Sequence, residues 1–95
     1  MSSLYITELS NGAGALQAAQ LPAIAEQKIT ISGTSAQSAA FQQETRMIRV
    51  HTDVACHILV GANPTATVST LRMAADSVEY FGVTPGHKVA VIAAA

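Results

Sequence analysis

Three histidines and one cysteine are the residues of this sequence that could bind a soft metal ion or form a nucleophile with its base: His51, Cys56, His57 and His87. Cys56 and His57 are neighbours in an apolar run that predicts a strand, so their side chains should point to opposite faces. A predicted turn separates His51 from His57. Because structural metal sites need a closed set of three or four ligands, we expect no metal site.

The same residues do not predict nucleophilic catalysis. A cysteine nucleophile needs a base within hydrogen-bond reach and a third group that orients the base. In the middle of a predicted strand, Cys56 is more simply a small buried apolar residue. We expect His57 to be a core or interface histidine with a satisfied ring nitrogen, and His87 to be solvated beside a turn.

Acid–base chemistry and phosphate binding are equally poorly supported. Two catalytic carboxylates must meet on one rigid site, whereas the acidic residues are spread singly: Glu8, Glu26, Glu44, Asp53, Asp76 and Glu79. The NGAG fragment at 11–14 is not followed by the Gly-Lys-Ser of a phosphate-binding loop. The sequence therefore predicts a protein that is not an enzyme and has no cofactor.

Charge is scarce in this chain. Charged residues make up 12% of the 95 residues, about half of the roughly 25% that is typical of soluble domains. The formal net charge is −1, and a surface with so little repulsion associates readily. The basic residues are scattered rather than clustered, which argues against nucleic acid as a partner. They are Lys28, Arg46, Arg49, Arg72 and Lys88.

The remaining composition argues against a membrane protein. No apolar run approaches the roughly 20 residues that span a bilayer, and the N-terminus lacks the features of a signal peptide. The single cysteine excludes an intramolecular disulfide and fits a reducing compartment. We expect a protein made in the cytoplasm, with no membrane partner.

The elements that would position these residues are predicted to be strands. A chain this short buries only about 60 to 65% of its unfolded surface, so one domain spans 1–95. We expect an irregular N-terminal arm at 1–22 and a β core at 23–95. Period-two alternation and β-branched content favour strands at AEQKITI, TRMIRVHTD, ACHILVG, LRM, SVEYFGV and KVAVI. The expected fold is all-β, a small antiparallel β-sandwich or jelly roll with an extended N-terminal arm.

Two turns are predicted to close hairpins. Thr52-Asp53-Val54 should join TRMIRVHTD to ACHILVG, with Asp53 as the turn former. Pro85-Gly86 suits the two central positions of a type II turn and should join SVEYFGV to KVAVI. In ACHILVG the apolar residues run on without alternation. This pattern indicates either a central strand of one sandwich or a strand covered by a second subunit.

Aromatic residues are few, and carbohydrate-binding sites usually need aromatic platforms. The chain contains Tyr5, Phe41, Tyr80 and Phe81 and has no Trp. Tyr80 and Phe81 should lie on opposite faces of their strand, so one of them at most could be a platform.

The second half of the chain, residues 45–92, resembles a family of small β-rich structural proteins of tailed bacteriophages. The segments that carry the resemblance are V-H-x-D, A-C-H-I-x-x-G, N-P-T-A-T and E-Y-F-x-V-x-P-G-x-K-V-A-V-I. The first 44 residues match nothing in that family. The resemblance implies a head decoration or cement protein, located on the exterior of the phage head in the virion.

That implied function sets the expected partners. They are the major capsid protein and the chain itself, as a dimer or trimer, and a loose arm would suit strand addition to a neighbouring sheet. We expect the contacts at Leu4, Tyr5, Ile6, His57, Leu59, Asn63, Pro64 and Tyr80. Two alternatives remain open: a receptor- or glycan-binding module on the virion surface, and a head–tail or tail component.

Overall fold

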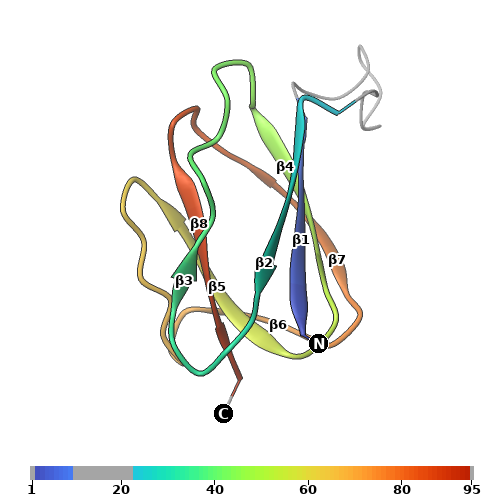
Figure 1. Ribbon diagram of the computed structural model, residues 1–95, viewed down its shortest axis with the longest axis vertical. Coiled ribbons are helices and arrows are strands. Elements are labelled where there is room, and N and C mark those ends of the chain that lie inside the picture. The colour runs from blue at the N-terminus through green and yellow to red at the C-terminus, as the bar shows by residue number, and fades with distance from the viewer. Residues whose placement is uncertain (1, 10–22, 95) are drawn as a thin grey trace.

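The computed structural model describes residues 2–9 and 23–94. These residues form eight strands and no helix (Figure 1). The strands form two four-stranded antiparallel sheets that pack against each other, so the predicted all-β antiparallel sandwich is confirmed. They are β1 (Ser3–Leu9), β2 (Ala25–Thr30), β3 (Ala36–Gln37), β4 (Met47–Thr52), β5 (Cys56–Gly61), β6 (Leu71–Met73), β7 (Val78–Gly82) and β8 (Lys88–Ala93).

The strands pair as nested couples. One sheet, here called the front sheet, has the order β2-β1-β4-β7, and the other, the back sheet, has the order β3-β8-β5-β6. Thus β3 pairs with β8, β4 with β7 and β5 with β6. The first and third of these strand pairs lie in the back sheet, and the second lies in the front sheet. This winding of nested couples is the construction of a jelly roll. The remaining couple, β1 with β2, closes the front sheet.

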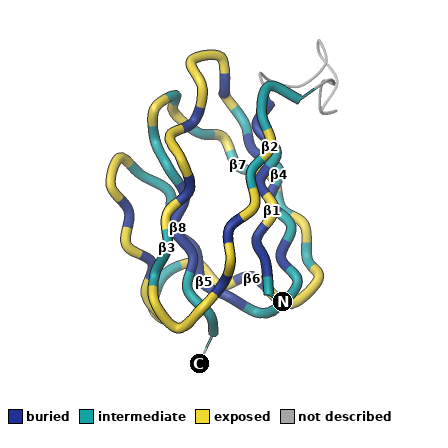
Figure 2. Tube along the Cα trace, viewed as in Figure 1, coloured by how far each residue is buried: buried dark blue, intermediate teal, exposed yellow. Residues whose placement is uncertain are grey.

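Alternation of apolar and polar residues explains which faces meet. In β4, Ile48 and Val50 point inward with 0% exposure, while Arg49 and His51 point outward. Figure 2 shows buried positions on strands of both sheets. The core between the sheets comprises Leu4, Ile6, Ile29, Ile31, Phe41, Ile48, Val50, Cys56, Ile58, Met73, Val89 and Val91.

Both predicted hairpins are wrong, although all of the predicted strands form. β4 and β5 lie in different sheets, and so do β7 and β8. The Pro85-Gly86 turn itself is present: the His87 N–H donates to the Thr84 carbonyl at 3.1 Å, and Gly86 has φ of +84°. Each turn therefore carries the chain from one sheet to the other. Burying the inner faces of β4, β5, β7 and β8 requires that crossing, because every one of them presents apolar side chains to the same core.

The predicted N-terminal arm is wrong for residues 3–9. They form β1, which pairs with β2 on one side and β4 on the other and is thus an inner strand of the front sheet. Leu4 and Ile6 are 0% and 1% exposed, so this strand supplies part of the core. The rest of the predicted arm, residues 10–22, lies outside the described residues.

The burial of β8 and of the first half of β5 has an explanation within one chain, although Leu59 on the outer face of β5 is exposed. Both are inner strands of the back sheet, and residues 62–70 fold over the outer side of that sheet. Gln37 Nε2 donates to the Pro64 carbonyl at 2.7 Å, and the Ala66 N–H donates to Ser35 Oγ at 2.9 Å. Ala66 and Ala90 are 2% and 0% exposed as a result. The chain's own loop therefore covers part of the outer side of this sheet, and cover of the exposed Leu59 by a second subunit stays a prediction.

Candidate functional site

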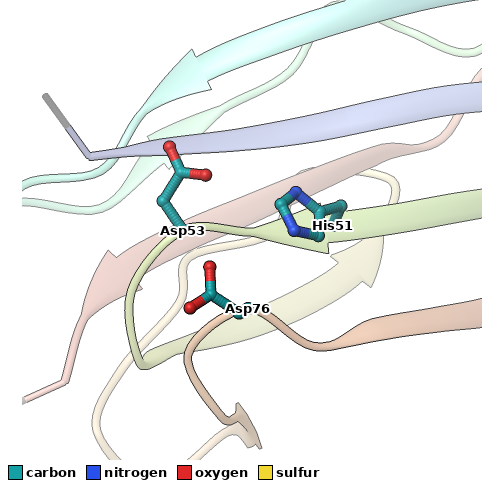
Figure 3. Close-up of side chains that lie close together, drawn as sticks. All are labelled: His51, Asp53 and Asp76. Atoms are coloured by element: carbon teal, nitrogen blue, oxygen red, sulfur yellow. The ribbon is translucent and has the colours of Figure 1, made fainter.

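A cluster of three potential metal ligands lies at the end of the sandwich where two links cross between the sheets. His51 is near the end of β4, Asp53 lies in the β4–β5 link, and Asp76 lies in the β6–β7 link (Figure 3). One ligand atom from each residue lies within 4.8 Å of the other two. We call His51, Asp53 and Asp76 the turn cluster. The expectation that the acidic residues are spread singly is therefore wrong for Asp53 and Asp76.

Backbone hydrogen bonds hold the turn cluster together. The Asp76 N–H donates to the Thr52 carbonyl at 2.8 Å, and the Thr52 N–H donates to the Ser77 carbonyl at 3.3 Å. The Asp53 N–H donates to the Ser3 carbonyl at 3.2 Å. Asp76 adopts a left-handed conformation with φ of 60°, which aspartate tolerates better than most residues. The backbones of the two links are therefore fixed relative to each other and to β1.

The outer face of the front sheet is a second candidate, and we call it the tyrosine face. Strand register places Lys28, Tyr5, His51 and Val78 in one row across the four strands, and Glu26, Thr7, Arg49 and Tyr80 in the next row. Tyr80, Val78 and Tyr5 are 52%, 40% and 38% exposed. Tyrosine and arginine are the residue types that most often dominate binding at protein interfaces. This face therefore has the composition of a binding surface.

Tyr5 organises one end of the tyrosine face. Its ring centroid is 5.9 Å from that of His51, with an interplanar angle of 30°. The Lys28 ammonium lies 5.6 Å from the Tyr5 ring centroid, within range of a cation–π interaction. A shallow hollow of about 370 Å³ lies beside these side chains, lined in part by Thr7, Glu26 and Arg49. The front sheet thus presents an aromatic and basic surface rather than an apolar one.

An apolar groove of about 270 Å³ opens along one edge of the sandwich. Because β6 spans three residues and pairs only as far as Ile58, the second half of β5 has no strand beside it at this edge. The groove is lined by Ile58, Leu59, Val60, Thr70, Leu71, Phe81 and Gly82. Strand β7 is the edge of the opposite sheet here. Two sheet edges and an apolar hollow therefore occur together.

The expected contact residues are divided between surface and interior. Tyr5, Leu59, Asn63 and Tyr80 are exposed. Leu4 and Ile6 are core residues, so they cannot contact a partner while the sandwich is folded, and their assignment to the interface is corrected. Pro64 is buried in the loop that covers the back sheet. The expected alternation of Tyr80 and Phe81 is confirmed: Tyr80 points outward, and Phe81 packs against the core.

His57 has the environment expected from the sequence. It is 9% exposed, and its Nδ1 lies 2.9 Å from the Thr70 carbonyl oxygen. That contact needs a proton on Nδ1, because a carbonyl oxygen only accepts. His57 therefore links β5 to the loop that covers the back sheet, and the expected burial with a satisfied ring nitrogen is confirmed, while its place in an interface stays a prediction.

Cys56 is expected to be unreactive and to make stability depend on alkaline pH. It is 0% exposed, and burial raises the pKa of its thiol above the ordinary 9.0, although a hydrogen bond with Thr52 and the charge of Arg72 partly offset this effect. Because the thiol has a higher pKa in the folded protein than in the unfolded chain, its contribution to the free energy of unfolding is fully present below pH 9.0. This contribution is lost as the pH rises through the pKa of the thiol in the folded protein. Labelling by a thiol reagent at pH 8 should be at least about 100-fold slower than in the urea-unfolded protein. Equal labelling rates in the folded and unfolded protein would contradict the burial of Cys56. In Cys56→Ala, the part of the stability loss at alkaline pH that comes from this thiol should be absent.

Comparisons with known proteins leave the family of this chain open. No family model matches it, and neither the curated proteins nor the solved structures include one with significant similarity. In the described part of the chain, no helix has the length and apolar character that crossing a membrane requires.

Proposed function

We propose that this protein is a structural component of a phage virion, which binds the outside of the capsid as a homo-oligomer and cements neighbouring capsomers. The observation that carries the proposal is the tyrosine face. It places two exposed tyrosines and Arg49 on a regular sheet, and side chains held by a rigid scaffold lose little conformational entropy on binding. The resemblance of residues 45–92 to head decoration proteins supplies the class of partner.

The back of the sandwich supports a one-sided attachment. The loop at 62–70 covers the outer side of the back sheet through bonds to Ser35, Gln37 and His57. Among the described residues, Tyr5, Val78 and Tyr80 of the tyrosine face stay exposed. Capsid binding is therefore assigned to the front sheet.

Charge on the tyrosine face favours an acidic partner surface. Within the two rows of this face, Lys28 and Arg49 face outward against Glu26, and the carboxylates of Asp53 and Asp76 lie beyond its His51 end. Complementary charge steers association and limits binding to wrong partners. We assign the face to an acidic patch on the major capsid protein.

Self-association is assigned to the edge with the apolar groove. There the unpaired part of β5 and the edge strand β7 offer backbone hydrogen-bonding groups beside apolar side chains. Strand addition at an exposed edge uses such groups for affinity. The jelly-roll winding is a supporting analogy alone, since viral capsid domains and lectins share it and a fold does not fix a function.

Tyr80→Ala is expected to weaken binding to phage heads that lack the protein by about 30-fold or more, as for a tyrosine hot spot at an interface. Titration of purified protein onto such heads measures this change. Val68→Ser is the control, because Val68 is 56% exposed but lies in the loop over the other sheet. Its affinity should equal that of the wild type.

Three results would overturn the proposal or replace it. A wild-type protein that stays monomeric and fails to raise the rupture temperature of these heads would overturn it. Glycan binding that Tyr80→Ala abolishes, with head binding intact, would support the receptor-binding alternative instead. A ring with a central channel in electron micrographs would support the connector alternative.

A further inference from the structure

We propose that the turn cluster binds a divalent transition-metal ion of the Zn²⁺ or Mn²⁺ type, which links the two sheets at this end of the sandwich. The three ligands come from β4, the β4–β5 link and the β6–β7 link. Both links cross between the sheets. The inference does not depend on the proposed function.

The donor set determines the class of ion. One imidazole nitrogen and two carboxylate oxygens match the ligands of Zn²⁺ and Mn²⁺, whereas Mg²⁺ and Ca²⁺ prefer oxygen throughout. Three protein ligands leave further coordination positions to water or to another ligand. We therefore expect Mg²⁺ and Ca²⁺ to bind more weakly than Zn²⁺.

The distances are within reach of a coordinated state. Metal–ligand bonds of about 2.0 to 2.2 Å place neighbouring ligand atoms about 3 to 3.5 Å apart. The cluster's ligand atoms lie within 4.8 Å of one another, so a small rotation of the two aspartate side chains toward His51 is sufficient. Asp76 is exposed and Asp53 is partly exposed, which leaves their carboxylates free to make that movement.

The surroundings favour a cation over the alternative of two turn-forming aspartates. A turn-forming aspartate commonly accepts a hydrogen bond from a backbone N–H two residues further on. Within residues 2–9 and 23–94, the hydrogen bonds of Asp53 and Asp76 involve their backbone N–H groups, and none involves the carboxylates. A cation bound between the two carboxylates would be attracted by both of them.

His51 is also oriented for the site from outside it. Its ring packs against Tyr5 at 5.9 Å between centroids, which limits rotation of the imidazole. Outer groups that fix a ligand's orientation commonly alter metal affinity by about 10- to 100-fold. Tyr5 is thus a positioning residue for the cluster, besides its place on the tyrosine face.

Calorimetric titration of the full chain with ZnCl₂ tests the proposal. We expect one ion per chain for the wild type, and an affinity loss of about 10-fold or more in each of Asp53→Asn, Asp76→Asn and His51→Gln. Asparagine also tolerates the left-handed conformation at position 76, so Asp76→Asn keeps the fold. Glu26→Gln and His87→Gln are matched controls outside the cluster and should bind as the wild type does. Unchanged affinity in both aspartate variants, or no wild-type binding at millimolar Zn²⁺, would overturn the proposal.

Two further measurements locate the ion. Mn²⁺ should broaden the amide NMR signals of residues 51–53 and 75–77 first, and earliest broadening around Glu26 or Glu44 would overturn the assignment. Zn²⁺ at about 100 times its Kd should raise the Tm by about 10 °C or more. That rise should be absent in Asp53→Asn, and an equal rise in this variant would also contradict the site.

Discussion

Replacing Glu8 by glutamine is expected to lower the free energy of unfolding by about 3 kcal/mol, since hydrogen bonds to a charged group contribute about 1.5 to 3 kcal/mol each. Glu8 is 0% exposed and accepts three hydrogen bonds: from Thr45 Oγ1 at 2.7 Å, from the Gln42 N–H at 2.8 Å and from Gln27 Nε2 at 2.8 Å. The glutamine amide at position 8 would have one oxygen instead of two, so its NH₂ group would face one of these hydrogen-bond donors. Urea denaturation measures the loss.

The network around Glu8 cannot rearrange without further loss. Gln27 could turn its own amide to accept from the new side chain, but its Oε1 already accepts from the Ala39 N–H at 2.9 Å. Turning the amide would therefore break a second bond. Thr45→Val removes a single donor and should cost less, about 1 to 2 kcal/mol.

Glu26→Gln is the matched control for Glu8→Gln. Glu26 is an exposed carboxylate on β2, and its loss should change stability by no more than about 0.5 kcal/mol. Equal stability of the Glu8 and Glu26 variants would mean that the buried carboxylate does not hold the 42–45 segment against β1.

Leu4→Ala is expected to destabilise the protein by about 3 kcal/mol, within the 2 to 5 kcal/mol usual for a buried leucine. Leu4 is 0% exposed and lies on the inner face of β1, opposite Thr52 of β4 and Ile29 of β2. Its removal leaves a cavity between the two sheets, which packed neighbours can close only in part. Thermal and urea unfolding should both report the change.

Tyr5→Ala is the neighbouring control for Leu4→Ala. Tyr5 faces outward and is 38% exposed, so its truncation should cost less than about 1 kcal/mol. A much larger loss of stability in Leu4→Ala than in Tyr5→Ala is expected if residues 3–9 form an inner strand, and similar small losses are expected if they form a loose arm. If Leu4→Ala were as mild as Tyr5→Ala, residues 3–9 would not be part of the core.

Strand positions were predictable, because alternation is a local property. In TRMIRVHTD, Ile48 and Val50 alternate with Arg49 and His51, and this pattern is that of β4. The type II turn at Pro85-Gly86 was predictable for the same reason, since proline and glycine restrict the backbone locally. Local chemistry thus defined most of the elements.

Strand partners could not be predicted from the same signals. Asp53 and Gly86 favour turns, but a turn does not determine whether the chain continues in the same sheet or crosses to the other one. β1 is hard to predict because LYITEL stands in a region rich in Ala, Gln, Ser and Gly, where a short alternating run also suits an extended arm. Its position depends on β4, which lies far along the chain.

The turn cluster could not be predicted from the sequence, because its members are distant along the chain. Asp53 and Asp76 are 23 positions apart by their numbers, and each is a plausible turn former by itself. Only the crossing of two links at one end of the sandwich brings them beside His51. A partial signal was present: Asp53 directly follows β4 and Asp76 stands two residues before β7, so each aspartate lies in a short link between strands.

The alternation of couples between the sheets has a consequence for how the molecule folds. Neither sheet can be completed while the other is absent, because the chain enters and leaves each sheet repeatedly. Stable partial structures are disfavoured in such a winding, and loops must close before distant strands contribute. Refolding should therefore be slow for a chain of this size and occur as a single cooperative step, in the range of milliseconds to seconds that is typical of sandwiches built from distant pairs.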